Sequence, residues 1–206
     1  MNVLVINYGM GNLGSVRRAF EECGASVLVS EDPADLADAQ RIVLPGVGAF
    51  PDAMTRLNAA GWPAKLRETL QNPGVHLLGI CLGMQLLADK GHEVVETPGL
   101  GLIRGEIVRF APANGERVPH VGWNEVHHRQ SSPLLAGIGD GTDFYFVHSY
   151  HFRAAQPASV LATTPYCGEF AAVVGAGNVF GTQFHPEKSS RPGFQLLRNF
   201  LQPPAN

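Results

Sequence analysis

The apolar residues of the first half of the chain form short runs that alternate with helix-like patterns. Residues 3–6 are continuously apolar, which is typical of a strand buried on both faces of a parallel sheet. Further strands are predicted at residues 26–29, 41–44 and 75–80. One helix face is formed by Leu13, Val16, Phe20 and Cys23, and helical segments are expected over residues 52–70, with a break near residues 61–63. The alternation over the first ~90 residues predicts a parallel α/β sheet.

The second half has a different pattern, rich in predicted strands. Residues 107–110, a turn containing Asn114-Gly115 and residues 118–126 predict a β-hairpin. Further strands are expected at residues 144–152, 171–174 and 179–184. A closing helix is expected over about residues 192–201, followed by a frayed tail at residues 202–206. No repeat or linker divides the chain, so one domain over residues 1–206 is predicted.

Composition narrows the class of protein. The 206 residues carry a formal net charge of −3 and 16% are charged, which gives no electrostatic reason to expect nucleic-acid or anionic-membrane binding. No apolar run approaches the roughly 18 residues that span a bilayer, and no basic segment precedes the apolar start. The 3 cysteines are widely spaced, which favours a reducing compartment, and no spacing supports a metal site. A soluble cytoplasmic protein without a metal or cofactor is expected.

The first candidate site is Gly79-x-Cys81-x-Gly83, between the strand at residues 75–80 and a helix beginning at Leu82. It is the cysteine form of the nucleophile elbow, whose sharp turn leaves no room for side chains at the flanking positions. The helix dipole should favour the Cys81 thiolate, and the Leu82 N–H is a candidate oxyanion donor. A buried structural cysteine is the alternative, which the flanking glycines disfavour.

A cysteine nucleophile needs a base, and His185 is the best candidate. It follows the strand at residues 179–184 and precedes Pro186-Glu187. Proline keeps the preceding residue extended, and residues two apart in extended chain project to the same side. Glu187 can therefore accept a hydrogen bond from Nδ1 of His185 and leave Nε2 facing a thiol. The sequence predicts a Cys81-His185-Glu187 triad, while most of the other histidines are expected to be structural or exposed.

A second oxyanion donor is expected from another loop at the carboxyl edge of the sheet, where ligands of open α/β folds bind. The segment Pro45-Gly46-Val47-Gly48 follows a predicted strand, and its glycines allow the Val47 or Gly48 N–H to turn inward. An ordinary β-turn is the alternative interpretation of this segment.

A competing motif lies near the start of the chain. Residues 9–14 match Gly-x-Gly-x-x-Gly after a strand, and Asp32 lies at about the distance of a ribose-binding acid. A dinucleotide-dependent oxidoreductase is therefore the second hypothesis, although a tight strand-to-helix turn explains the glycines equally well. The oxidoreductase hypothesis leaves the Cys81 elbow unexplained, and the sequence contains no evident domain for a hydride substrate. A third hypothesis, a non-catalytic scaffold, is disfavoured by the intact triad.

Several segments together resemble the class I (triad) glutamine amidotransferases. They are PGVGAF (45–50), GICLGMQ (79–85), PHVGWN (119–124), YFVHSY (145–150) and GTQFHPEKS (181–189). Within that class the chain is similar to the glutaminase subunits of imidazole glycerol phosphate synthases, of histidine biosynthesis, over essentially its whole length. The resemblance implies a three-layer α/β/α, flavodoxin-like amidotransferase fold with a mixed, mainly parallel central sheet. Another synthase of the class, such as the one that makes anthranilate, is an alternative.

The resemblance also implies a chemistry. Cys81 attacks the side-chain amide of glutamine, His185, oriented by Glu187, protonates the departing ammonia, and water cleaves the glutamyl thioester. Two side chains match family positions that hold the amino-acid end of glutamine, namely Gln85 and Glu93. Main-chain N–H groups near Ser149 and Tyr150 match those that bind its carboxylate.

A partner protein is implied as well. The family's glutaminase subunit forms a heterodimer with a (β/α)8-barrel cyclase subunit, which receives ammonia through an internal tunnel. Positions that match the interface are Asn12, Trp123, Tyr145 and Lys188. Glutaminase activity is then expected to be weak until the partner and its ligand are bound, with the loop at residues 45–48 as the switch.

Overall fold

The computed structural model describes residues 1–113 and 115–202, which contain a mixed sheet and five α-helices. The strands are β1 Asn2–Ile6, β2 Ser26–Ser30, β3 Arg41–Gly46, β4 His76–Cys81, β5 Lys90–Gly91, β6 Thr97–Pro98, β7 Gly105–Arg109, β8 His120–His128, β9 Thr142–His148, β10 Tyr150–Ala154, β11 Val160–Pro165, β12 Glu169–Ala176 and β13 Val179–Thr182. The α-helices are α1 Leu13–Glu22, α2 Phe50–Ala59, α3 Trp62–Thr69, α4 Leu82–Gln85 and α5 Ser190–Leu201. Short 3-10 helices lie at Pro33–Asp38, Pro133–Leu135, Pro157–Ser159 and Pro186–Lys188.

The central part of the sheet is parallel, as the apolar runs predict. Strands β2, β1, β3, β4 and β13 lie side by side in that order, and each neighbouring pair is parallel. Beyond β13 the order continues through β12, β10 and β7 with antiparallel pairs. Strand β13 comes from the second half of the chain and pairs Thr182 with Ile80 of β4. The residues that follow β4 and β13 therefore leave the sheet at the same edge.

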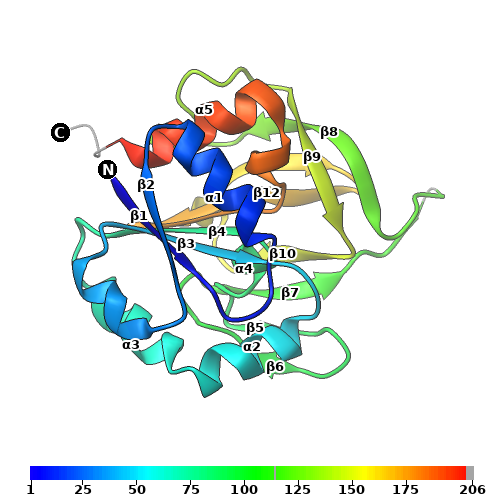
Figure 1. Cartoon of the computed structure of the whole chain (residues 1–206). Helices are drawn as coiled ribbons and strands as arrows, with labels where there is room; N and C mark the ends of the chain where they lie inside the picture. Colours follow the sequence, from blue (N-terminus) through cyan, green and yellow to red (C-terminus); the bar gives the residue numbers. More distant parts are fainter. Residues whose placement is uncertain (114, 203–206) are drawn as a thin grey trace.

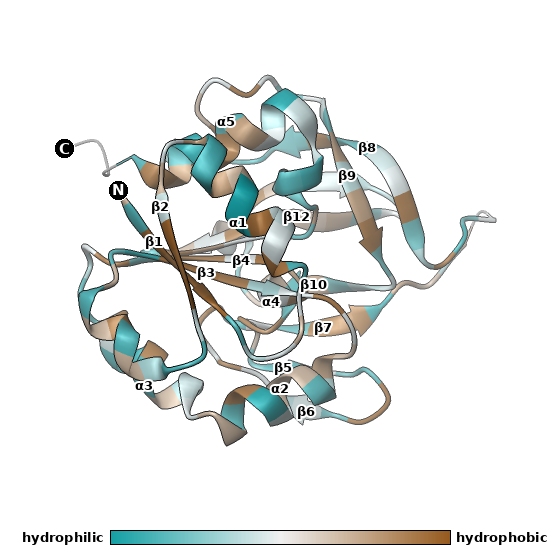
Figure 2. Cartoon of the chain, viewed as in Figure 1, coloured by the Kyte–Doolittle hydropathy of each residue, from teal (hydrophilic) through white to brown (hydrophobic). Residues whose placement is uncertain are grey.

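Two apolar cores cover the two faces of this sheet. Helices α1 and α5 lie on one side of the central strands, and α2 and α3 lie on the other (Figure 1). Because successive strand residues point to opposite faces, Val3 and Val5 pack in the core that contains Phe20, whereas Leu4 packs in the core that contains Leu57. Figure 2 shows the strongly apolar strands β1 and β3 between helices of mixed polarity. The strands are buried on both faces, which explains their continuous apolar runs.

The predicted hairpin between residues 107–110 and 118–126 is wrong. Strand β7 pairs with β10 and β5, whereas β8 pairs with β9 and β11. The predicted strand at residues 144–152 is interrupted at Ser149, and its two parts, β9 and β10, become the partners of β8 and β7. Pairing between segments distant in the sequence replaces the expected local turn. Asn114 of that turn, and residues 203–206 of the predicted tail, lie outside the described residues.

Other elements differ in length from the predictions. Helix α4 has only 4 residues, because the carbonyls of Leu86, Leu87 and Ala88 accept hydrogen bonds from backbone N–H groups of residues 100–103. Strand β3 continues through Pro45 and Gly46, so the loop begins at Val47. Strand β13 ends at Thr182, and β11 has no counterpart among the predicted strands.

Candidate active site

Cys81 lies at the sharp turn between β4 and α4. Its backbone has φ +56° and ψ −110°, a conformation that residues with side chains rarely adopt and that often marks functional sites. The flanking glycines are required by close packing. A Cβ atom on Gly83 would lie 1.7 Å from the carbonyl oxygen of Leu44, and one on Gly79 would lie 2.6 Å from that of Gly83. The backbone thus has the geometry of a nucleophile elbow.

The Cys81 side chain is only 7% exposed and has polar neighbours on two sides. Its sulfur lies 3.8 Å from Nε2 of Gln183 and 3.9 Å from the carbonyl oxygen of Val147. The predicted contribution of a helix dipole is reduced, because α4 is one turn long and a macrodipole grows with helix length.

His185 is held by Glu187, its neighbour two residues on. Nδ1 of His185 lies 2.8 Å from Oε1 of Glu187, and both side chains are at most 3% exposed. His185 has the extended backbone expected before proline, with φ −97° and ψ +96°. Burial by itself lowers the pKa of His185, but the Cys81 side chain and the Glu187 carboxylate outweigh it and raise the pKa to about 10. His185 is therefore positively charged at neutral pH.

Cys81 and His185 line one cavity of about 310 Å³. Nε2 of His185 is buried and has no hydrogen-bond partner among the described residues. Of the other residues predicted from the sequence, the cavity is lined by Val47, Gly48, Leu82, Gln85, Glu93, Ser149 and Tyr150. Its remaining lining residues, which the sequence did not single out, are Pro119, Val147 and His148. Glu187 is not part of the lining and contacts His185 from outside the cavity.

Two polar side chains of the cavity are fixed by hydrogen bonds. Nε2 of Gln85 donates to the carbonyl oxygen of Tyr150 at 2.9 Å and to Oε1 of Gln183 at 3.0 Å. Oε2 of Glu93 accepts the N–H of Phe50, the first residue of α2, at 2.7 Å. The first N–H groups of a helix lack intrahelical partners, and Glu93 supplies one for Phe50. Glu93 is therefore not the solvated acid that a loop position suggests.

The loop after β3 reaches the same cavity. Gly46 pairs with Cys81 in the parallel register of β3 and β4, so Val47 and Gly48 follow directly at the cavity edge. Gly48 has φ +109°, which favours glycine, and a Cβ atom there would lie 2.7 Å from Cε of Met10. The loop thus has a backbone conformation that a side chain at Gly48 would disturb.

Comparisons with known proteins agree with this geometry. The family model described as "Glutamine amidotransferase class-I" matches residues 4–203. Imidazole glycerol phosphate synthase subunit HisH of Chromobacterium violaceum is 50% identical to the chain, over 98% of this chain and 97% of that protein. HisH of Moorella thermoacetica is 49% identical, over 96% and 93% respectively. The chain belongs to the class-I glutamine amidotransferases and, within them, to the HisH subunits of imidazole glycerol phosphate synthase.

Solved structures establish the amidotransferase fold. A crystal structure of a glutamine amidotransferase has a TM-score of 0.74 at 22% identity, with 96% of each chain covered. The structure of PurLQS from Thermotoga maritima has a TM-score of 0.73 at 19% identity, with 97% of each chain covered. Identities this low show the fold alone. These structural matches confirm the predicted fold, a mixed, mainly parallel sheet with a β-rich second half.

Membership of this amidotransferase family removes the dinucleotide hypothesis. Asp32, its candidate ribose ligand, instead accepts the N–H of Ala34 at the start of a 3-10 helix. A Cβ atom on Gly14 would have no atom within 4 Å, so this glycine does not serve the close helix packing of a dinucleotide site. Gly9 and Gly11 lie in the turn between β1 and α1, and Gly14 is the second residue of α1.

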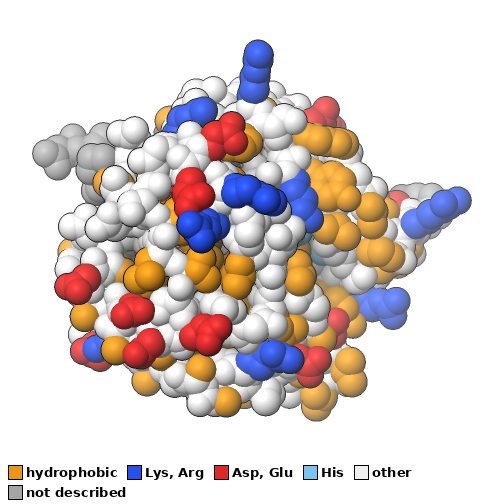
Figure 3. Space-filling model, in the orientation of Figure 1, with side chains coloured by type: hydrophobic (Ala, Val, Ile, Leu, Met, Phe, Trp, Pro, Cys, Tyr) orange, Lys and Arg blue, Asp and Glu red, His pale blue; other side chains and the backbone are white. Residues whose placement is uncertain are grey.

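The residues predicted at a partner interface occupy accessible positions. Trp123 on β8 pairs with Tyr145 on β9, their rings are 6.1 Å apart, and Trp123 is 53% exposed. Lys188 is exposed two residues before α5, and Asn12 is exposed and caps α1 by accepting the N–H of Ser15. Figure 3 shows hydrophobic side chains gathered over β8 and β9.

Gln183 is a site residue that sequence reasoning missed. It contacts both Cys81 and Gln85, and it lies two positions before His185. The spacing that places Glu187 beside His185 also puts Gln183 on the same side of an extended chain, so this signal was available. His148 and Pro119 reach the cavity from β9 and from the residue before β8, and only the pairing of these strands brings them there.

The described residues show neither a membrane-spanning helix nor a metal-ligand cluster. None of the helices in residues 1–113 and 115–202 is both long and apolar enough to cross a membrane. The same residues contain no group of three or more histidine, cysteine or acidic side chains placed to hold a metal ion.

Proposed function

We propose that this chain hydrolyses glutamine to glutamate and ammonia, as the glutaminase subunit of an imidazole glycerol phosphate synthase in histidine biosynthesis. The observation that carries the proposal is the shared cavity of Cys81 and His185, with Glu187 hydrogen-bonded to the far side of the imidazole. A cysteine beside an imidazolium is a reactive thiolate. The relatives named HisH, at 50% and 49% identity, favour this synthase over another member of the class.

In the first half of the reaction the Cys81 thiolate attacks the amide carbon of the glutamine side chain. The carbonyl oxygen becomes an oxyanion, and the N–H of Leu82 with that of Val47 or Gly48 stabilises it. The protonated His185 then gives its Nε2 proton to the amide nitrogen. The C–N bond breaks, ammonia leaves, and a glutamyl thioester on Cys81 remains beside a neutral His185.

In the second half water replaces ammonia. Neutral His185 takes a proton from a water molecule, and the resulting hydroxide attacks the thioester carbon. The C–S bond then breaks, glutamate leaves, and Cys81 returns as a thiolate beside the imidazolium. Glu187 keeps the imidazole oriented throughout and favours its charged form.

The other polar groups of the cavity suit the amino-acid end of glutamine. The Glu93 carboxylate and the Gln85 amide bind the α-ammonium group, and main-chain N–H groups at Ser149 and Tyr150 bind the α-carboxylate. All four residues line the cavity that contains Cys81. A negative and a positive end are thus recognised by groups of opposite charge or polarity.

A HisH subunit works with a partner subunit, and we infer that this partner is a (β/α)8-barrel cyclase that uses the ammonia. The interface would contain Asn12, Trp123, Tyr145 and Lys188. The exposed apolar side chains on β8 and β9 support this placement, with Val121 57% and Val147 38% exposed beside Trp123. Large exposed apolar side chains in one patch are typical of protein interfaces.

The loop at Val47 and Gly48 is the proposed switch. It links the end of β3 to α2, and a turned peptide there adds or removes one oxyanion donor. Losing one donor typically lowers kcat by about 10²–10³-fold. Partner binding can therefore raise glutamine hydrolysis strongly by reorienting one peptide.

The test measures glutamate and ammonia released from glutamine by the purified chain, alone and with a barrel cyclase subunit and its ligand. The proposal predicts release that rises with the partner and is lost in Cys81→Ala but kept in Cys167→Ala, a half-buried cysteine outside the cavity. Turnover that persists in Cys81→Ala contradicts it. Ammonia transfer to an anthranilate-forming subunit instead would assign the chain to the other synthase.

A further inference from the structure

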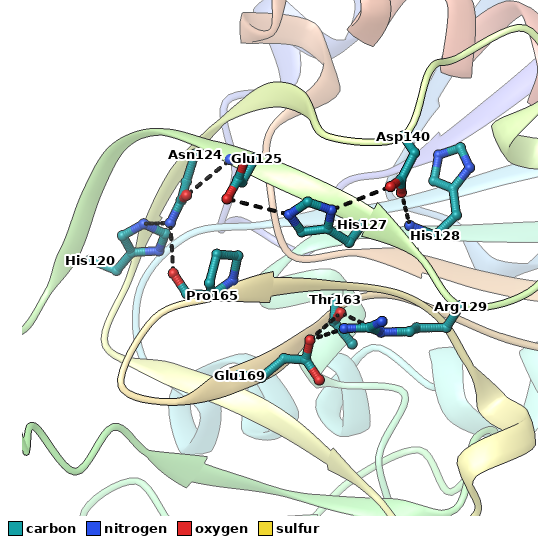
Figure 4. A network of polar contacts seen from close by, with 10 residues as sticks. All are labelled: His120, Asn124, Glu125, His127, His128, Arg129, Asp140, Thr163, Pro165 and Glu169. Carbon is teal, nitrogen blue, oxygen red and sulfur yellow. Dashed lines mark hydrogen bonds and ion pairs between the residues drawn. The ribbon is translucent and has the colours of Figure 1, made fainter.

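Three buried or half-buried side chains connect the outer strand β8 to the active-site cavity. Nδ2 of Asn124 lies 3.2 Å from Nε2 of His120, and Nδ1 of His120 lies 3.2 Å from Nε2 of His148. Nδ1 of His148 lies 2.8 Å from the carbonyl oxygen of Tyr150. Figure 4 shows the outer part of this chain, where Asn124 faces His120 and Pro165.

In this series of hydrogen bonds, the donor and acceptor of each contact follow from the Tyr150 carbonyl at its inner end. The carbonyl oxygen of Tyr150 can only accept, so Nδ1 of His148 donates to it. A neutral imidazole has one N–H, so Nε2 of His148 accepts the N–H of Nδ1 of His120. Nε2 of His120 then accepts from the amide of Asn124. Reversing one contact would remove the hydrogen bond from His148 to the Tyr150 carbonyl, which would then accept from Gln85 alone.

Both imidazoles are neutral under ordinary conditions. Burial lowers the pKa of His120 to about 4 and that of His148 to about 3. The ring of His120 stacks against Tyr166 with centroids 3.9 Å apart and against Phe146 at 5.0 Å. These ring faces offer no hydrogen bonds to replace the water that would surround an added charge.

The series of hydrogen bonds ends on the segment that lines the substrate cavity. Tyr150 O accepts two hydrogen bonds, from His148 and from Nε2 of Gln85, and these fix the plane of the peptide that follows Tyr150. His148, Ser149 and Tyr150 all line the cavity, at the point where β9 ends and β10 begins. The Ser149 carbonyl oxygen accepts the N–H of Phe110 at 3.0 Å, and the contacts of His148 and Gln85 hold the next peptide.

We infer that Asn124, His120 and His148 are positioning residues that hold the main chain at residues 148–150 in the orientation that binds the amino-acid end of glutamine. This inference rests on the proposed glutaminase function. His120 does not line the cavity, so it acts through His148 and not by touching the substrate. The series of hydrogen bonds begins at Asn124 on β8, one residue after Trp123 and next to the proposed partner interface.

The experiment compares two substitutions of His120 in the full chain with its barrel partner. His120→Phe keeps a ring for the stack on Tyr166 but has no N–H for His148. His120→Asn loses the ring and keeps an amide N–H near the place of Nδ1. His151→Phe is the matched control. His151 also stacks on an aromatic ring, that of Phe110 at 4.8 Å, but it is not one of the hydrogen-bonded residues Asn124, His120 and His148.

The KM for glutamine should rise about tenfold in His120→Phe, the effect of one lost hydrogen bond, with a smaller change in kcat. It should rise less in His120→Asn and stay unchanged in His151→Phe. A KM in His120→Phe equal to that of the unaltered chain would overturn the inference, and so would equal increases in both His120 variants. Absence of glutamine turnover in the unaltered complex would instead overturn the proposed function.

The tautomers give a second test that needs no turnover. Nitrogen-15 NMR of the full chain should show that His120 and His148 are each protonated at Nδ1 and not at Nε2. In His120→Phe the Nε2 resonance of His148 should move toward that of a nitrogen without a donor. Protonation of either ring at Nε2 would contradict the order of contacts on which the inference depends.

Discussion

Gly46 of β3 lies directly beside Cys81 of β4 in the parallel register of the two strands. One residue further on, the chain leaves the sheet at Val47, so the elbow and the proposed oxyanion loop begin from adjacent positions on one edge of the sheet. A Cβ atom on Gly46 would lie 2.4 Å from the Tyr8 hydroxyl and 3.0 Å from Cβ of Leu82. The approach of loop to nucleophile therefore depends on glycine at this position.

The first prediction concerns this loop. Gly48→Ala adds a side chain at φ +109°, where L residues are strained, and should turn the peptide away from the oxyanion position. We expect kcat for glutamine hydrolysis to fall about 100-fold or more, with little change in KM. Steady-state kinetics measure this. Gly14→Ala is the control, since its Cβ atom meets nothing within 4 Å. Equal kcat values in the two variants would contradict the role of the loop.

The second prediction concerns the contact between His185 and Glu187. Glu187→Gln removes the carboxylate that helps to raise the pKa of His185 to about 10, while burial continues to lower it. Less imidazolium is then present to protonate the leaving amide nitrogen, so kcat should fall by about 10²-fold. The alkaline limb of the profile of kcat against pH should also move to lower pH. A profile measured from neutral to alkaline pH checks both effects, and an unmoved alkaline limb would count against the assignment.

The third prediction concerns stability in acid. The pKa of His120 is lowered to about 4 and that of His148 to about 3, from an ordinary value of 6.5. Below pH 6.5 the unfolded chain binds protons that the folded chain does not, so the free energy of unfolding falls as the pH falls. Each histidine contributes a slope approaching about 1.4 kcal/mol per pH unit between pH 6.5 and its folded pKa.

Urea unfolding between pH 7 and about pH 4.5 measures this slope. The pKa values of His76 and His151 are also lowered, so the unaltered chain should lose stability through several groups at once. His120→Phe should reduce the slope by the share of one histidine. Identical slopes in the two proteins would show that His120 is protonated in the folded state as easily as in the unfolded state.

The fourth prediction concerns the partner surface. Trp123→Ala should weaken binding of the barrel subunit by about 2 kcal/mol or more, because exposed aromatic side chains at the centre of an interface carry much of the binding energy. Leu28→Ala is the control, since Leu28 is 52% exposed, close to the 53% of Trp123, but lies on β2, which pairs with β1 and not with β8 or β9. Calorimetric titration of each variant with the barrel subunit measures the two affinities. Equal affinities would exclude β8 from the interface.

The sequence predicted the elements whose signal is local. The continuous apolar run at residues 3–6 requires a strand covered on both faces, and the core around β1 has that arrangement. The hairpin of residues 107–126 failed because register and strand partners depend on pairing between distant segments, which periodicity does not encode. The short length of helix α4 was not predictable for a similar reason, since residues 100–103 supply the hydrogen bonds to Leu86, Leu87 and Ala88 that end it.

The candidate site was predictable to the same extent. Cys81 was found from its flanking glycines, and the contact between His185 and Glu187 from the two-residue spacing in extended chain. His148 gave no such signal, because its place in the cavity depends on the break between β9 and β10 and on the pairing of His148 with His120. These are properties of the assembled sheet and not of any one segment.

Trapping of the thiol is the most direct test of the central claim, that Cys81 is the nucleophile activated by His185. A chloroketone analogue of glutamine is incubated with the complex, and the labelled residue is identified by mass spectrometry. The account predicts one label per chain on Cys81, protection by glutamine, and much slower labelling in His185→Asn, with Cys23 and Cys167 unmodified. Labelling at another residue, or full glutamine turnover by a chain already labelled at Cys81, would contradict it.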